Sequence, residues 1–200
     1  MAEYAKELQD LIERLGNLLR ADVRVSCHAS GVRPVQLEAL NFLTQCNHYS
    51  DTPQAVADYL GLTKGTVSQT LKVLEEKGLL RKQGDSNDKR VVHLKPTARG
   101  RRLVGRAVPA GLLTSGIEQL PETELRDTLN ALRGLLHSVQ KANHLRTFAP
   151  CYSCRFNTKR ESGYFCELTQ ESLAESEIAL LCREHQFPKV SHVAKKTTKA

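Results

Sequence analysis

Two short helical patterns separated by a single turn constrain this chain more than any other feature. The first starts at Thr52, whose hydroxyl can cap a helix with proline at its first position, and Gly61 ends it. The second starts after the capping residue Thr63 and ends at Gly78. Two short helices joined by a tight, glycine-containing turn predict a helix-turn-helix over about residues 52–77.

Two β-compatible runs follow this motif. Residues 79–83 and 90–94 flank a cluster of Gly, Asp, Ser and Asn residues that favours a turn. They predict a β-hairpin, here called the wing, over about residues 79–94. The expected fold class is therefore mostly α (α+β), a winged helix-turn-helix.

Helical apolar stripes flank the motif on both sides. Leucines recurring at three- and four-residue spacing over residues 8–19 predict one long helix, and a second helix is expected over about residues 34–47. After the wing, the pattern is helical again from Thr97, and Pro121 starts a further helix whose leucine stripe spans residues 125–136. Helices are therefore expected on both sides of the motif.

Positive charge is concentrated in the same region. Between Gly61 and Arg106 the sequence has twelve Lys or Arg and four Asp or Glu, an excess larger than the net charge of +7 for the whole chain. A concentrated basic segment favours a polyphosphate partner, because each neutralised phosphate releases condensed counterions. On charge alone, a solvated face that only keeps the protein soluble is an equally good explanation.

The second helix of the motif has an outward face suited to the major groove of DNA. Val67, Leu71 and Leu74 share one side of a helical wheel, and small or polar residues occupy the other. There Gln69 can bond an adenine edge, while hydroxyls and lysines can meet bases or phosphates. The helix N-terminus adds backbone donors that favour phosphate.

Five short motifs in this region occur together in one order and spacing. They are Pro53-Gln54-Ala55-Val56-Ala57, Leu60-Gly61-Leu62-Thr63, Thr66-Val67-Ser68, Leu74-Glu75-Glu76-Lys77-Gly78-Leu79 and Asp88-Lys89-Arg90. Together they resemble the multiple-antibiotic-resistance regulator (MarR) family, and the resemblance covers about residues 5–146. It implies a transcription regulator that binds double-stranded DNA and forms a homodimer through the long flanking helices.

The resemblance also implies roles for individual residues and a mode of action. Arg90 of the wing is expected in the minor groove, with Asp88 orienting it, and Gln69 stands where the family often has arginine, which favours adenine at that position. The implied mode is repression at a pseudo-palindromic operator, relieved by a small-molecule effector. The expected DNA contacts are Thr63, Lys64, Thr66, Ser68, Gln69, Lys72, Arg81, Lys82, Asp88 and Arg90.

Two other classes of function compete with DNA binding as explanations of this sequence. A winged helix can serve as a protein-interaction module, but such a module does not need the basic recognition face. An enzyme is not expected, because the sequence has no glycine-rich phosphate loop, no His-Glu-x-x-His pair and no nucleophile elbow, and its histidines are scattered. The sequence therefore favours a DNA-binding regulator.

From residue 149 the chain becomes rich in cysteine and aromatic residues. Cys151, Cys154, Cys166 and Cys182 form the pattern C-x2-C-x11-C-x15-C. Four thiolates are a complete ligand set for one metal centre, and about forty residues bury too little apolar surface to be stable without such support. Residues 149–188 are therefore predicted to form a small metal-binding module.

The sequence leaves the identity of that centre open. Zinc is slightly favoured, and an iron–sulfur cluster, which uses the same four thiolates, would make the protein a redox sensor. A reversible disulfide switch and four unligated thiols are the remaining alternatives. His185 is expected at most to support the ligands, and Cys27 and Cys46 receive no role.

The expected organisation is a winged-helix domain over residues 1–148, the cysteine-rich module over 149–188 and a basic, disordered tail over 189–200. The composition, 40% hydrophobic and 26% charged, is that of a folded soluble protein. No stretch has the uncharged length needed to cross a bilayer, and the N-terminus lacks the apolar centre of a signal peptide. We therefore expect a cytoplasmic protein, in a compartment where disulfides are disfavoured.

Overall fold

The computed structural model describes residues 1–86, 88–161 and 163–188, and the chain divides into two compact units. The first unit is Met1–Leu145 and the second is Arg146–Ala200, so the boundary lies three residues before the one expected from the sequence. The tail expected over residues 189–200 lies outside the described residues. None of the described helices combines the length and apolarity needed to cross a membrane.

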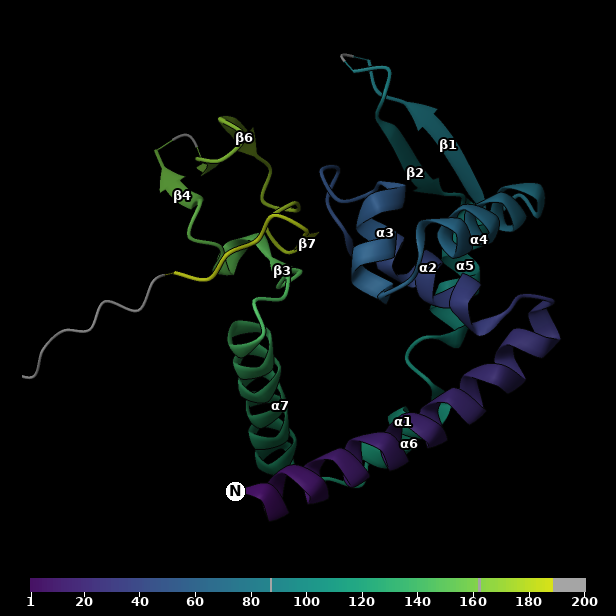
Figure 1. Cartoon of the computed structure of the whole chain (residues 1–200), viewed down its shortest axis with the longest axis vertical. Coiled ribbons are helices and arrows are strands. Elements are labelled where there is room, and N and C mark those ends of the chain that lie inside the picture. Colours follow the sequence, from purple (N-terminus) through teal and green to yellow (C-terminus); the bar gives the residue numbers. More distant parts are fainter. Residues whose placement is uncertain (87, 162, 189–200) are drawn as a thin grey trace, which may run out of the picture. The chain divides into compact units, whose positions relative to one another are not determined.

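The first unit consists of helices and a two-stranded antiparallel sheet (Figure 1). Long helices stand at both ends of this unit, and short helices and the hairpin lie between them in the sequence. Its elements in chain order are α1 (Ala2–Ser30), α2 (Pro34–Gln45), α3 (Pro53–Leu60), α4 (Lys64–Glu76), β1 (Leu80–Gly84), β2 (Val92–Pro96), α5 (Ala98–Ala107), α6 (Gly111–Ile117) and α7 (Glu122–Ala142).

Local signals set the two helices of the helix-turn-helix where the sequence predicts them. The Thr52 hydroxyl accepts a hydrogen bond from the Ala55 amide at 3.3 Å, and Pro53 occupies the first helical position of α3. Gly61 ends α3 with φ of 64°, a left-handed conformation that glycine adopts without a Cβ clash. The Thr63 hydroxyl then caps α4.

The core of this unit lies under the helix-turn-helix, where α2 packs against α3, α4, α5 and β2. Apolar residues spaced at three and four positions on the helices face inward, and strands β1 and β2 each contribute a leucine to the same core. The side chains that are no more than 2% exposed include Leu37, Leu40, Phe42, Val56, Val67, Leu71, Leu74, Leu80 and Leu94. The core therefore holds α4 in place from its buried side and leaves the opposite face of the helix outward.

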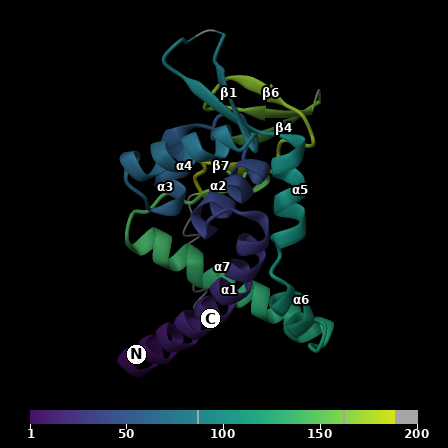
Figure 2. The same cartoon turned by 90° about the vertical axis from the view of Figure 1, so that its right-hand side faces the viewer.

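Strands β1 and β2 form the predicted wing, which extends beyond α3 and α4 (Figure 2). They pair antiparallel, from Leu80 opposite Pro96 to Gly84 opposite Val92. The second strand begins two residues later than the sequence suggested, because the turn is longer. The Val91 amide donates to the Asp88 carbonyl at 2.9 Å, which keeps the intervening residues in the turn.

The helical pattern after the wing is divided between α5 and α6. Val108 is extended, with φ of −134° and ψ of 126°, and Pro109 follows it. Proline disfavours helical geometry at the preceding residue and has no amide to continue the ladder, so α5 ends at Ala107.

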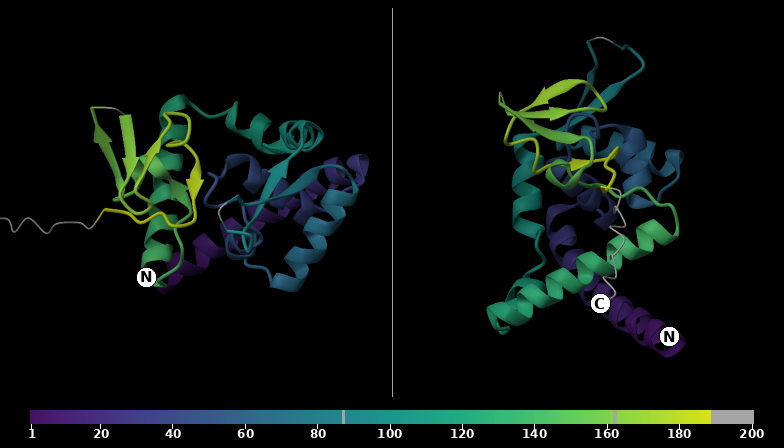
Figure 3. Two further views of the ribbon diagram at one scale, coloured as in Figure 1. Left: turned by 90° about the horizontal axis from the view of Figure 1, so that it is seen from above. Right: turned by 90° about the vertical axis from the view of Figure 1, so that its left-hand side faces the viewer.

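The second unit is built from short strands and one 3₁₀ turn (Figure 3). Its three-stranded sheet has the order β4-β5-β6, and β3 pairs with β7 in a separate two-stranded sheet. The Arg160 guanidinium lies over the ring of Phe165, 3.4 Å from its centroid. The elements are β3 (Ala149–Pro150), η1 (Cys151–Ser153), β4 (Asn157–Arg160), β5 (Gly163–Cys166), β6 (Glu171–Leu173) and β7 (Leu181–Cys182).

Candidate nucleic-acid interface

The outward face of α4 has the composition that the sequence predicted for a recognition helix. Val67, Leu71 and Leu74 are buried, and they leave the opposite side of the helix to solvent. All six predicted contact residues of this helix and its cap are exposed, namely Thr63, Lys64, Thr66, Ser68, Gln69 and Lys72. Their side chains are therefore available to a partner.

The N-terminus of α4 is capped by the hydroxyl group of Thr63, which also contacts the hydroxyl group of Thr66. The Thr66 amide donates to Thr63 Oγ1 at 3.2 Å, and the two threonine hydroxyls lie 2.9 Å apart. These two contacts orient the hydroxyl groups of Thr63 and Thr66 at the start of α4, because each side chain is held by the other. A DNA backbone that reaches this turn meets hydroxyl groups that are already oriented.

Arg90 stands on the turn of the wing and is oriented by Asp88, as the resemblance implied. Its Nε and Nη2 lie 3.0 and 2.9 Å from the two carboxylate oxygens of Asp88, and its side chain remains 90% exposed. The hydrogen bonds from Arg90 lower the pKa of Asp88, and the same bonds raise the pKa of Arg90. The pair therefore presents an oriented guanidinium to solvent, although as a surface ion pair it adds little stability.

A hollow of about 480 Å³ separates the first turns of α3 and α4 from the wing. Its walls combine apolar side chains of the core with three cations, Lys64, Lys82 and Arg90. This brings positions from the helix and the wing together around one concave surface. The complete lining is Thr52, Pro53, Gln54, Lys64, Val67, Ser68, Leu71, Lys82, Arg90, Val91 and Val92.

Two of the predicted cationic contacts also have acidic neighbours within the chain. Lys82 Nζ lies 2.6 Å from Glu75 Oε2, and Lys72 Nζ lies 3.9 Å from Glu76 Oε1. Both pairs are substantially exposed, so a phosphate can compete for the lysines at small cost. Arg81 is exposed on β1, and the hollow does not include it.

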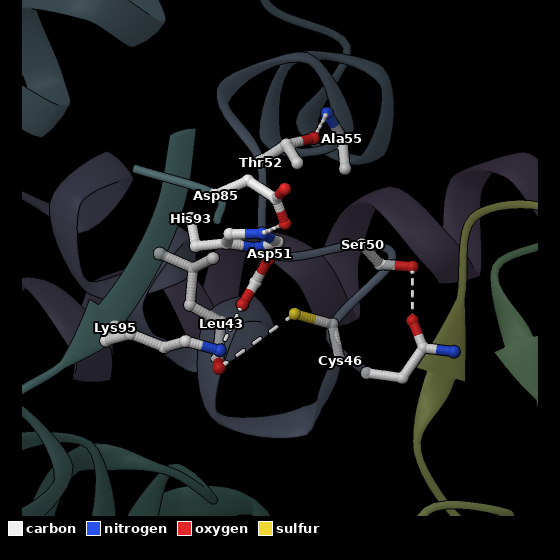
Figure 4. A network of polar contacts seen from close by, with 10 residues as sticks. Leu43, Cys46, Ser50, Asp51, Thr52, Ala55, Asp85, His93 and Lys95 are labelled. Carbon is white, nitrogen blue, oxygen red and sulfur yellow. Dashed lines mark hydrogen bonds and ion pairs between the residues drawn. The ribbon is translucent and has the colours of Figure 1, made fainter. Parts of the chain in front are cut away.

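Residues that the sequence analysis did not single out connect the wing to the start of α3 (Figure 4). The ring of His93 on β2 contacts Asp51 Oδ1 through Nδ1 and Asp85 Oδ2 through Nε2. Lys95 Nζ contacts the other oxygen of Asp51. One signal was present in the sequence: His93 and Lys95 alternate about the buried Leu94, so both project from the same face of a strand.

Residues 30–91 match the model of the MarR family, a stretch that contains the helix-turn-helix and most of the wing. The chain contains a MarR-family domain. The resemblance inferred from the motifs and the winged-helix fold are thereby confirmed. No curated protein shows significant similarity to the chain.

Solved structures of MarR-family regulators share the fold. A MarR family protein from Bacillus stearothermophilus is 19% identical, with a TM-score of 0.58 over 70% of this chain and 98% of that one. The S. aureus MepR–DNA complex is 23% identical, with a TM-score of 0.55 over 65% and 96% of the two chains. CouR from Rhodococcus jostii RHA1, bound to p-coumaroyl-CoA, is 22% identical, with a TM-score of 0.52 over 66% and 92%.

The four cysteines predicted as metal ligands lie in the second unit, outside the MarR-family domain. Cys151 and Cys182 are buried, Cys154 and Cys166 are partly exposed, and none of the four forms a disulfide. Within the described residues, no group of three or more His, Cys, Asp or Glu side chains is arranged to hold a metal ion. The metal centre therefore stays a prediction.

The backbone nevertheless connects the segments that carry these cysteines. Ala149 pairs with Cys182 across β3 and β7, and the Cys154 amide donates to the Cys151 carbonyl at 3.0 Å. Asn157 links Cys154 to Cys166, because its amide donates to the Cys154 carbonyl at 3.1 Å and it pairs with Cys166 across β4 and β5.

His185 is buried beside this region and both of its ring nitrogens are engaged. Nδ1 lies 2.6 Å from the Thr147 hydroxyl, and Nε2 lies 3.0 Å from the Ser153 hydroxyl. The His185 amide donates to the Cys182 carbonyl at 3.3 Å. Hydroxyl groups therefore occupy both ring nitrogens of His185.

Proposed function

We propose that the chain is a dimeric, sequence-specific repressor that binds a pseudo-palindromic DNA operator through its MarR-family domain. One observation carries this proposal: the exposed polar face of α4 borders a hollow lined by Lys64, Lys82 and Arg90. A polyanion with grooves fits a recognition helix flanked by a cationic wing. A winged helix that only docks onto proteins has no need for this combination.

The apolar stripes of the two longest helices support dimerisation. On α1, Leu8, Leu11 and Leu15 are at least 44% exposed. On α7, Leu132 and Leu136 are 48% and 58% exposed. Rows of exposed leucines on two long helices favour association, because burial of each side chain removes apolar surface from water. We propose that a second copy of the chain covers them.

We propose regulation rather than catalysis as the role of this protein, in the cytoplasm, with a small molecule as the signal. CouR, which shares the fold, was crystallised with p-coumaroyl-CoA. By analogy, an effector that binds one arrangement of the dimer better than another would shift operator affinity.

The cysteine-rich unit carries a second proposal, a thiolate metal centre formed by Cys151, Cys154, Cys166 and Cys182. Support comes from the backbone hydrogen bonds that join their segments and from the engaged nitrogens of His185. Metal binding would require the thiols to reorient, because the described side chains do not form a ligand group. We propose zinc as the metal, with an iron–sulfur cluster as the alternative.

The DNA-binding proposal is tested with a duplex selected by the purified protein from a random-sequence pool. Because lysines and arginine should displace counterions, the logarithm of the affinity should fall linearly with the logarithm of the salt concentration. Arg90→Ala should cost about 1–3 kcal/mol of binding free energy if the side chain makes a groove contact. Arg126→Ala, on the exposed surface of α7, is the matched control and should leave the affinity unchanged. An affinity that changes neither with the salt concentration nor on Arg90→Ala would contradict the proposal.

The metal proposal is tested on protein purified without oxygen. Elemental analysis should find about one bound centre per chain, and Cys154→Ser should lose it, while Cys46→Ser should retain it. A visible absorption spectrum separates the alternatives, since a cluster is coloured and zinc is not. A bare polypeptide with all thiols titratable would leave the disulfide or unligated alternatives.

A further inference from the structure

His93 bridges two carboxylates that belong to different parts of the first unit (Figure 4). Its Nδ1 lies 2.5 Å from an oxygen of Asp51, just before α3, and its Nε2 lies 3.0 Å from an oxygen of Asp85, at the start of the wing turn. Ionised carboxylates only accept hydrogen bonds. Both contacts can be hydrogen bonds at once only when the imidazole is protonated on both nitrogens.

The Asp51 end of this bridge is held by the surrounding structure. Only 5% of its side chain is exposed, its second oxygen contacts Lys95, and its carbonyl accepts the Leu94 amide at 2.7 Å. The Asp85 side chain is 27% exposed. A buried carboxylate oxygen that loses its donor costs more free energy than a partly exposed one. A neutral His93 therefore keeps its single proton on Nδ1, toward Asp51.

The proton that His93 loses is therefore the one on Nε2, which faces Asp85. Asp85 in turn organises the wing turn. Its Oδ1 accepts the Asp88 amide at 2.8 Å, and its own amide donates to the Val91 carbonyl at 3.1 Å. Asp88 in turn holds Arg90 through side-chain and backbone bonds. A continuous set of hydrogen bonds thus leads from the start of α3 through His93 to the arginine of the wing.

We propose that His93 is a pH-sensitive latch: its doubly protonated ring fixes the wing turn to the start of α3, and its deprotonation releases the turn and weakens operator binding. The proposal rests on the DNA-binding function proposed above. It concerns the position of Arg90 and assigns His93 no contact with DNA. His93 is a positioning residue in this scheme.

The direction of the pH effect follows from the groups that face the ring. Hydrogen bonds to Asp51 and Asp85 raise the pKa of His93 above its ordinary value, against the smaller opposing effects of burial and of the Lys95 charge. Since the folded pKa is raised, the stabilisation is complete below about pH 6.5 and is lost as the pH rises through the folded value. The wing is therefore latched at low pH and released once the pH exceeds the raised pKa of His93.

The first test measures operator affinity at constant salt between pH 6 and pH 8.5, using the duplex selected from the random pool. The wild type should lose about fivefold in affinity across this range beyond any change seen in His93→Gln. The matched control His28→Gln, an exposed histidine at the end of α1, should retain the wild-type pH dependence. Asp85→Asn preserves the side-chain shape and should remove the dependence, which guards against a misfolded His93 variant.

The second test measures the latch without DNA. Nitrogen-15 NMR of the histidine rings should give His93 a pKa above 6.5, and Asp85→Asn should lower it. If the pKa of His93 is ordinary and Asp85→Asn leaves it unchanged, the latch proposal is overturned even when the protein binds DNA. Equal pH dependence of affinity in the wild type and Asp85→Asn would also overturn it. Absence of DNA binding at every pH, with the raised His93 pKa intact, would instead refute the proposed function.

Discussion

A single glycine at the start of α5 offers a sharp test of how the wing is anchored to the core. Gly100 is buried, and a Cβ added there would lie 2.3 Å from the Leu79 carbonyl oxygen and 3.5 Å from a methyl of Leu40. That carbonyl already accepts the Thr97 amide at 3.0 Å, immediately before β1. We therefore expect Gly100→Ala to destabilise the fold, although alanine is the better helix former.

The magnitude follows from opposing effects. An ordinary van der Waals contact begins near 3.4 Å, so α5 and the start of β1 must separate by about 1 Å. The Thr97 hydroxyl, which donates to the Gly78 carbonyl at 2.8 Å, resists that movement. Overpacking of this kind costs about 1–3 kcal/mol, and the helix propensity of alanine returns about 1 kcal/mol at most. The net loss should be up to about 2 kcal/mol, or a decrease in Tm of up to about 8 °C.

Gly105→Ala is the matched control, because this glycine lies on the same helix and a Cβ there meets nothing within 4 Å. It should stabilise the protein by up to about 1 kcal/mol through helix propensity alone. Urea unfolding followed by circular dichroism, at one fixed protein concentration, measures both variants. Equal stabilisation by the two alanines would refute the close approach of α5 to the chain before β1.

Two further predictions concern assembly and thiol chemistry. Leu11→Glu on α1 and Leu132→Glu on α7 should each convert the proposed dimer to a monomer in sedimentation velocity at micromolar concentration, because they place charge on the proposed interface. Lys6→Glu, on the polar side of α1, should leave the dimer intact. Burial, with a smaller contribution from Glu38, raises the pKa of Cys27, so its thiolate should be scarce and alkylation at pH 8 slower than that of the partly exposed Cys154. Equal alkylation rates, measured by mass spectrometry, would contradict the buried position of Cys27.

The helix-turn-helix was predictable because its signals are local. A hydroxyl cap, a proline at the first position and a left-handed glycine act within a few residues, so Thr52, Pro53 and Gly61 specify α3 almost without the rest of the chain. The outward face of α4 followed from the burial of Val67 and Leu71 by the same periodicity. The same helical wheel left Lys64 and Ser68, which line the hollow, outside the core.

Features that depend on distant residues were harder to predict. The delayed start of β2 depends on how the turn closes between Asp88 and Val91, and residue propensities alone do not fix that length. The contact between His93 and Asp51 joins residues 42 positions apart. A histidine and a lysine alternating on a strand indicated a polar face, but only the packing of β2 against α3 shows which carboxylate they meet.

The cysteine-rich unit illustrates a different limit, since spacing specifies a ligand set but does not specify how the ligands converge. The interval between Cys151 and Cys154 fits one 3₁₀ turn, and the structure forms that turn. Convergence with Cys166 and Cys182 depends on the register of β4 with β5 and of β3 with β7, which the sequence does not encode locally. A structural metal usually contributes part of the folding free energy of so small a unit. A metal bound by this unit would draw the four thiols together, so the metal content of purified protein decides between a metal centre and free thiols more directly than any spacing argument.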